Sequence, residues 1–323
     1  MIDGGAVKRI VFVAFTFLLF SGCAKKVKTP DQLFNEGMSA VKEKKYGDAI
    51  TPLKEALSKD LSPKRKETAS FALAESYFKK GDYVEAAVQY KEFLTLFPAS
   101  KYAKEALYKL GICYMDMIKG PQWDQSFTYK AIDVFTAFMS KYPDDELSGK
   151  VSTLLNVCRK ILAEHELYIG QTYDISKKFT ASAKRYENVI NVYKDVESED
   201  KLLFLLGRAK FYTYIQAERE IGNLQEQLKT EEDKFAEAKT EEEKKVARNR
   251  ISLILNDIDQ WRELEVLAKK DGKKLLEELI KKYPSSFYSK KAIKILNGKK
   301  VFDKVSIENP IEKSFMKRFF ETF

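Results

Sequence analysis

The sequence repeats one spacing of large and small residues across pairs of helical segments, and this repetition limits the possible folds more than any other feature. The clearest copy occupies residues 68–98. Its pattern residues are Leu73, Ala74, Tyr77, Ala86 and Tyr90. Small residues let two antiparallel helices approach closely, while the larger ones fill the space around them. Gly81 can end the first helix in a left-handed conformation, and Pro98 cannot continue the second.

This spacing is typical of the tetratricopeptide repeat, a helix–turn–helix unit of about 34 residues. One unit cannot bury both of its faces, so at least about three must stack. Four further segments carry the spacing, and they begin with Leu33 and Gly37, Leu107 and Gly111, Ile169 and Gly170, and Leu203 and Gly207. The sequence therefore predicts an all-α, right-handed solenoid of about five tetratricopeptide repeats over residues 29–297.

The fifth repeat contains a long insertion, because its second helix returns only at Gly272. Two heptad seams fill the insertion: Ile221, Leu224, Leu228, Phe235 and Ala238, and then Ala247, Ile251, Ile254, Ile258 and Trp261. Thr240 and Glu243 have the spacing of a helix-starting capping box between the seams, which indicates a reversal. We predict an antiparallel coiled-coil hairpin over residues 215–268.

The N-terminus has the features of a secretory signal. Lys8 and Arg9 precede an apolar run over residues 10–20. This run is too short to span a bilayer, which needs about 20 residues, and it matches the apolar region of a signal peptide. We expect residues 1–22 to be a lipoprotein signal peptide.

The run ends in Phe20, Ser21, Gly22 and Cys23, which resembles the bacterial lipobox, with Phe20 in place of the usual Leu. The resemblance implies a covalent lipid on Cys23, diacylated on sulfur and acylated on nitrogen, and stable anchoring takes at least two such chains. Ala24 follows the cysteine, which by the lipoprotein sorting rule implies the outer membrane. Residues 23–28 would be a lipidated tether. The alternative is an ordinary signal followed by a free cysteine.

Composition indicates a scaffold rather than an enzyme. The 57 basic and 48 acidic residues are interspersed, as on a solvated helical surface, so the net charge of +9 does not predict nucleic-acid binding. There is one histidine, His165, and we find no metal-ligand spacing, no glycine-rich phosphate loop and no nucleophile paired with a base. We expect no catalysis, no metal and no cofactor besides the lipid. Cys113 and Cys158 are expected to be buried thiols without a disulfide.

The first helices of repeats one to three present an apolar strip at their fifth, ninth and twelfth positions, where the concave groove of such a solenoid lies. These residues are Phe34, Met38, Val41, Phe71, Glu75, Phe78, Tyr108, Ile112 and Met115. Aromatic and methionine side chains in a groove suit an extended peptide with hydrophobic side chains. The alternative is that the N-terminal tether or the C-terminal tail fills the strip.

Two other places are candidate partner contacts. Repeat three has an inserted loop around Trp123, which either packs on its own repeat as a lid or anchors an interface. The C-terminal tail, residues 298–323, carries Phe315, Phe319 and Phe320 on one helical face. This amphipathic helix either docks on the solenoid or binds a partner.

The lipobox, five repeats, the aromatic–proline ends at Phe97-Pro98 and Tyr142-Pro143, and the position of the loop together resemble the BamD family of outer-membrane assembly lipoproteins. The resemblance implies a scaffold on the periplasmic face of the outer membrane. It implies binding to unfolded barrel precursors and to a β-barrel assembly subunit with periplasmic domains. Another lipoprotein scaffold, such as a pilotin for a secretin or pilus or an envelope division factor, is the alternative.

Overall fold

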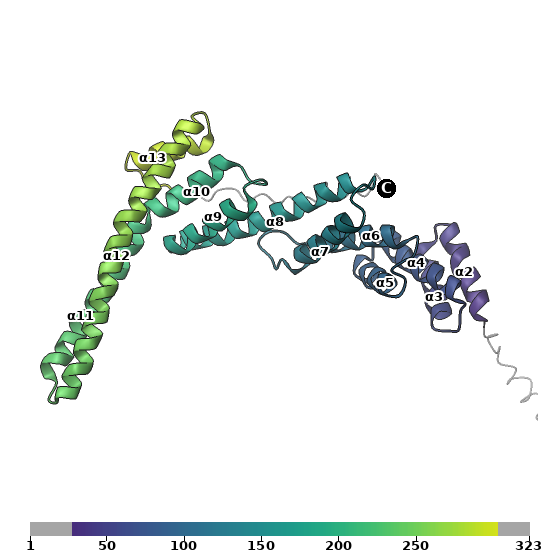
Figure 1. Ribbon diagram of the computed structural model, residues 1–323, viewed down its shortest axis with the longest axis horizontal. Coiled ribbons are helices and arrows are strands. Elements are labelled where there is room, and N and C mark those ends of the chain that lie inside the picture. The colour runs from purple at the N-terminus through teal and green to yellow at the C-terminus, as the bar shows by residue number, and fades with distance from the viewer. Residues whose placement is uncertain (1–27, 303–323) are drawn as a thin grey trace, which may run out of the picture. The chain divides into compact units, whose positions relative to one another are not determined.

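The structure is a computed structural model that describes residues 28–302, and this part of the chain is built from α-helices joined by short loops (Figure 1). The helices are α2 (Pro30–Lys42), α3 (Tyr46–Leu57), α4 (Pro63–Lys80), α5 (Tyr83–Leu96), α6 (Ala103–Asp116), α7 (Ser126–Lys141), α8 (Ser148–Ile175), α9 (Phe179–Tyr193), α10 (Glu199–Phe211), α11 (Thr213–Glu237), α12 (Glu241–Lys282) and α13 (Phe287–Leu296). The signal peptide, Cys23, and the tail residues Phe315, Phe319 and Phe320 lie outside the described residues. The all-helical repeat fold predicted from the sequence is confirmed.

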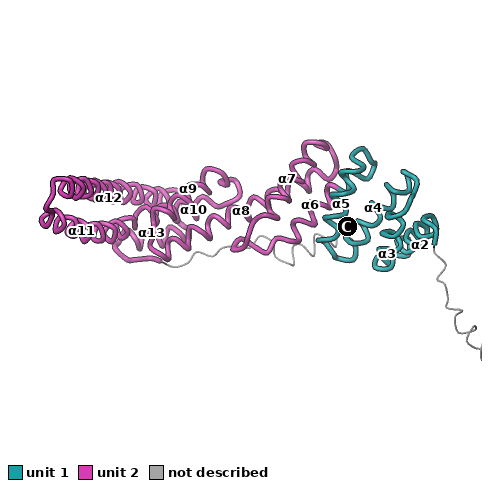
Figure 2. The backbone as a smooth tube through the Cα atoms, turned by 90° about the horizontal axis from the view of Figure 1, so that it is seen from below, with its two compact units in different colours: residues 1–106 teal, residues 107–323 magenta. Residues whose placement is uncertain are grey.

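The chain divides into two compact units, residues 1–106 and 107–323 (Figure 2). In the first unit α2 pairs with α3, α3 contacts α4, and α4 pairs with α5. Thr29 and Gln32 form the capping box that starts α2, as the sequence predicts. Gly37 shows why a small residue is needed there, because a Cβ atom on it would lie 2.6 Å from Leu53 Cγ. Gly81 ends α4 with a φ of 88°, in the left-handed region.

In the second unit the repeat pattern produces the same close approach. A Cβ atom on Gly111 of α6 would lie 2.3 Å from the Phe135 ring of α7, and one on Gly170 of α8 would lie 2.5 Å from the Tyr186 ring of α9. In each pair the glycine of the first helix accommodates the aromatic side chain of the second. Helix α8 contacts both α7 and α9, and α9 contacts α10, so the helices stack in chain order.

The fifth repeat is closed by α10 and the C-terminal part of α12. Their backbones nearly touch, because a Cβ atom on Gly272 would lie 2.2 Å from Phe211 N and 2.7 Å from Gly207 O. This confirms the prediction that the second helix of repeat five contains Gly272. Helix α13 then packs on both α10 and α12.

The hairpin differs from the prediction in one respect. Helices α11 and α12 pair along their length, and Thr240 and Glu243 form the predicted capping box at the reversal. However, α12 is one helix of 42 residues, so the outgoing arm does not stop at residue 268. No proline interrupts the sequence there, and a single glycine costs a helix only about 1 kcal/mol. The hairpin arm and the second helix of repeat five are therefore the same helix.

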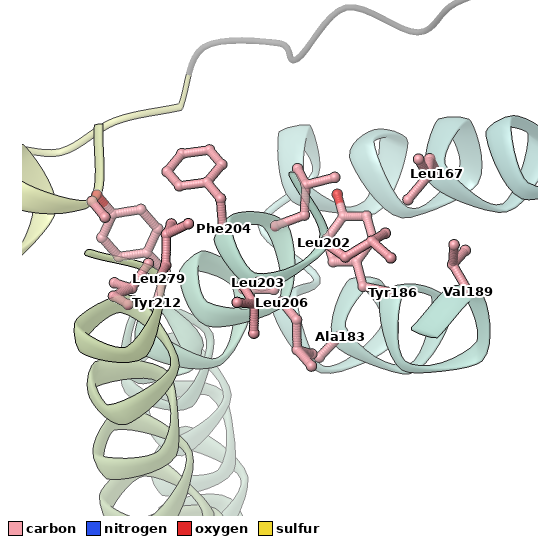
Figure 3. Packing of buried hydrophobic residues seen from close by; sticks show 14 of the residues in the cluster. Leu167, Ala183, Tyr186, Val189, Leu202, Leu203, Phe204, Leu206, Tyr212 and Leu279 are labelled. Carbon is pink, nitrogen blue, oxygen red and sulfur yellow. The ribbon is translucent and has the colours of Figure 1, made fainter. Parts of the chain in front are cut away.

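A hydrophobic cluster holds the base of the hairpin (Figure 3). It contains side chains from α8, α9, α10 and α12, among them Leu167, Tyr186, Phe204, Leu206 and Leu279. Tyr212, between α10 and α11, is almost fully buried. Its hydroxyl accepts a hydrogen bond from Val301 N–H at 2.8 Å and donates one to Lys299 O at 3.3 Å. These bonds hold the chain that follows α13 against the hairpin base.

Candidate partner-binding surfaces

In the first unit, the predicted groove residues lie on α2 and α4 and are half-buried. They are Phe34, Met38, Val41, Phe71, Glu75 and Phe78. Met38 packs against the core between α2, α3 and α4, and the Arg65 guanidinium lies 5.4 Å from the centre of the Phe34 ring. A half-buried aromatic or methionine side chain has one face held by the protein and one face open to a ligand.

Phe71 has a larger packing role than the sequence predicts. Its ring stacks on Tyr102 with centroids 4.5 Å apart and planes 10° apart, and it contacts the Phe93 ring at 5.5 Å. Aromatic pairs of this kind stabilise a fold by about 0.5–1.5 kcal/mol beyond the area they bury. A truncation of Phe71 would therefore change stability as well as the surface.

Glu75 is the one charged residue of the predicted strip. The hydroxyl of the buried Tyr90 donates a hydrogen bond to its carboxylate. Phe78 lies one turn further along α4, with its ring 5.4 Å from that of Tyr83 and 6.1 Å from that of Tyr90. The second helix of the repeat thus fixes the positions of both groove residues.

The prediction is wrong for α6 in the second unit. Tyr108, Ile112 and Met115 are only 4%, 2% and 0% exposed, so they do not line an open groove. The opposite side of α6 is also buried, through Ala106, Leu110 and Cys113. Helix α6 is therefore buried on two opposite sides, while Glu105 and Asp116 remain exposed. Repeat position alone could not distinguish a groove face from a second core face.

Trp123 lies in the predicted loop between α6 and α7, and its side chain is 54% exposed, so it is not a buried lid. The loop beneath it is held by internal bonds. The buried Gln125 amide donates to Gly120 O at 2.9 Å and to Trp123 O at 2.8 Å, and it accepts a bond from the Thr128 hydroxyl at 2.7 Å. His165 of α8 adds a bond between Nδ1 and Pro121 O. The loop therefore presents an exposed aromatic side chain from a fixed backbone.

Sequence reasoning missed a buried ionic cluster between α8 and α10. The Lys201 ammonium lies 2.8 Å from Glu164 Oε1 and 3.1 Å from Glu197 Oε2, and all three side chains are buried. The second oxygens, Glu164 Oε2 and Glu197 Oε1, have no hydrogen-bond partner. Burial raises the pKa of Glu164 to about 7 against the opposing effect of Lys201. The i,i+4 spacing of Glu197 and Lys201 is local, but it does not indicate burial, and Glu164 lies 37 residues from Lys201 in the sequence.

A second buried ion pair also joins α8 and α10. Arg208 Nη2 lies 2.6 Å from Asp174 Oδ2, and Tyr186 donates to the same oxygen at 2.8 Å. Ser182 donates to the other oxygen. The polar residues at the groove positions of repeat four are the signal that could have found this pair, because Gln171 and Asp174 are both buried. Within the described residues, these hydrogen bonds and this ion pair form a polar network that is part of the core.

The described residues contain no cluster of three or more His, Cys, Asp or Glu side chains suited to a metal ion. No helix among residues 28–302 is long and apolar enough to cross a membrane. Cys113 and Cys158 are buried thiols, as predicted.

The repeat region matches a known protein family. Residues 26–221 match the family model described as YfiO, outer membrane lipoprotein. This chain belongs to the YfiO family of outer membrane lipoproteins. The YfiO match ends within α11, so most of the hairpin lies beyond it. The resemblance stated from the sequence is confirmed.

Curated relatives of this YfiO chain have related names. A putative outer membrane protein assembly factor BamD of Aquifex aeolicus is 29% identical over 286 residues, which are 86% of this chain and 94% of the relative. BamD of Rickettsia prowazekii is 27% identical over 195 residues, which are 58% of this chain and 78% of the relative. Among solved structures, the TPR domain of P58(IPK) covers 83% of this chain and 66% of its own, with 14% identity and a TM-score of 0.36. The repeat fold is established by the helix pairs themselves.

Proposed function

We propose that this chain is a lipid-anchored scaffold of the β-barrel assembly machinery on the periplasmic face of the outer membrane. The observation that carries the proposal is the YfiO family match over the repeat region, together with relatives named outer membrane protein assembly factor BamD. A helical-repeat scaffold presents several contact surfaces at fixed positions. This suits a protein that binds an unfolded barrel precursor, its client, and a partner subunit at the same time.

The client surface is the half-buried strip on α2 and α4. An unfolded barrel precursor is an extended chain with alternating apolar side chains, and it needs shallow apolar contacts of low specificity. Met38 adapts its shape to different side chains, and Phe34 and Phe78 offer flat aromatic faces. These residues support binding of precursor segments in the first unit.

The partner surface includes the loop at Trp123. Exposed tryptophans on well-held loops are frequent anchors of protein interfaces. We expect this loop to contact the barrel-forming subunit through its periplasmic domains. Nucleic acid has no role in this scheme.

A crosslinked pull-down from envelope membranes tests the function as a whole. The expected result is recovery of a β-barrel membrane subunit with periplasmic domains. A Trp123→Ala chain should recover less of it, whereas Tyr129→Ala, which removes another exposed aromatic residue from α7, should not. Recovery of a secretin, a pilus protein or a division protein in its place would contradict the proposal and favour another envelope scaffold.

The client site is tested by calorimetry with a precursor peptide that ends in Phe. Phe34→Ala should weaken binding about thirtyfold, the effect of losing an anchor worth roughly 2 kcal/mol. Phe34 is preferable to Phe71 because it lacks the stacking on Tyr102. Val88→Ala, an exposed change on α5, is the matched control. Equal affinity for Phe34→Ala and wild type would exclude this strip as the client site.

A further inference from the structure

Helix α12 carries a second apolar seam besides the one that faces α11. Its apolar members are Val246, Leu253, Leu264 and Leu267, and all four side chains are exposed. Arg250, Asp257 and Gln260 lie between them, so the seven positions are spaced alternately by four and three residues. This is the spacing of a coiled-coil seam. At about 100° per residue, the second seam lies about 110° around α12 from the seam that faces α11.

An angle of about 110° between two seams is the one expected of a helix that contacts two neighbours in a bundle. The hairpin supplies only one of these neighbours, because the outer parts of α11 and α12 extend beyond the other described helices of this unit (Figures 1 and 2). A depression of about 560 Å³ lies along the same face of the hairpin. It is lined by Asp257, Gln260, Trp261 and Leu264 of α12 and by Glu220, Asn223, Leu224 and Gln227 of α11. The face is therefore hollowed, and its lining mixes apolar with polar side chains.

We propose that this seam pairs with the same seam of a second copy of the chain, with the two α12 helices antiparallel. The pattern of charges selects this occupant and this direction. In a parallel pair each core residue would meet itself, which places Asp257 against Asp257 and Arg250 against Arg250 of the second copy. Like charges in contact within an interface are repulsive.

The antiparallel arrangement removes both repulsions. When Leu253 lies opposite Leu264 of the second copy, the pairing places Asp257 opposite Gln260 and Arg250 opposite Leu267. The central layers then hold a carboxylate facing an amide donor, and leucine pairs flank them on each side. A hydrogen-bonded polar layer between apolar layers fixes the register of a coiled coil. The aliphatic stem of Arg250 can cover Leu267 while its head group stays in water.

From Arg250 to Leu267 the seam thus complements itself in apolar contacts and in hydrogen bonding, while Val246 at its end lies opposite Asp271 of the second copy. Because the two halves of the seam match each other, a second copy of the chain fits the seam, whereas a helix from an unrelated protein is not expected to fit it. Two hairpins joined in this way would form a four-helix bundle from two chains. The seam belongs to the second unit, whereas the α2 and α4 strip belongs to the first.

Sedimentation of the full mature chain carrying Cys23→Ala tests the proposal, because this change removes the lipid as a cause of association. We expect a monomer–dimer equilibrium within the micromolar range. Leu253→Glu should shift the dissociation constant upward by at least tenfold. Leu255→Glu is the matched control, because Leu255 is also exposed (45%, against 66% for Leu253) but projects from the opposite flank of α12. It should leave the equilibrium unchanged.

A chain that stays monomeric throughout this range, or a dimer equally sensitive to both substitutions, would overturn the proposal. Disulfide formation tests the direction of pairing, since the native Cys113 and Cys158 are buried. A mixture of Leu253→Cys and Leu264→Cys chains should form mixed disulfide dimers faster than either variant alone. Faster crosslinking of Leu253→Cys with itself would show a parallel pair and refute the antiparallel register.

Discussion

Some side chains in this molecule have packing roles that the sequence pattern does not reveal. Phe71 occupies a predicted groove position and also stacks on Tyr102. Glu164 occupies an ordinary helix position and is fully buried beside Lys201. In both cases the neighbour that decides the role lies outside the residue's own helix. Truncation of such residues therefore has to be judged on stability before it is judged on binding.

Glu164 makes stability depend on pH in an unusual direction. Burial raises its pKa in the folded chain from 4.5 to about 7. The folded state thus holds a proton that the unfolded state has released, and this contribution to stability falls as pH rises through that window. Glu164→Gln should lose this dependence. The melting midpoint of the variant should therefore rise relative to wild type between pH 5 and about 7.5.

Glu199→Gln is the control for this measurement, because hydrogen bonds from Lys282 and Tyr283 lower the pKa of Glu199. The contribution of a lowered pKa is fully present above pH 4.5 and falls only as the pH drops below that value, so the melting midpoint of Glu199→Gln should differ from wild type by a constant amount between pH 5 and about 7.5. If the melting midpoints of wild type and Glu164→Gln changed with pH in the same way, the cluster would not titrate between pH 5 and about 7.5.

At the scale of elements, the spacing of small and aromatic residues was sufficient to predict the helix pairs, and the capping boxes at Thr29 and Thr240 marked two helix starts. These features are local, so a single sequence contains them. The continuity of α12 was not predicted, because repeat spacing indicated a new helix at Gly272 while helix propensity allowed the first one to continue. The burial of both sides of α6 was missed for a related reason, since periodicity shows which residues share a face but not what covers that face.

Glycine substitutions separate close helix contact from helix propensity. Gly272→Ala should destabilise the second unit by roughly 2 kcal/mol or more, because the added Cβ would lie 2.2 Å from Phe211 N. Gly222→Ala in α11 has open space around it and should stabilise the helix by up to about 1 kcal/mol. Denaturant unfolding of both variants measures the difference. Similar effects of the two substitutions would mean that α10 and α12 do not meet at Gly272.

For the whole molecule, we expect the anchor and the scaffold to be separable. The lipobox resemblance predicts a lipid on Cys23. Cys23→Ala should therefore release the chain from membranes without changing its melting midpoint. Fractionation after a high-salt wash measures this, with Cys158→Ala as a cysteine control that leaves the lipobox intact. A variant that stays with the membrane pellet would show that another contact is the main tether.

The continuity of α12 has a mechanical consequence. A helix of 42 residues is about 63 Å long, and it is a stiff rod on that scale. The helix is held against α10 where Gly272 meets the α10 backbone, ten residues before the C-terminal end of α12, and its N-terminal end is the tip near Thr240. A sideways force on the tip is therefore transmitted along α12 as a torque on the contact between Gly272 and α10. A partner that holds the tip would thus exert force on the helix pair that closes the fifth repeat.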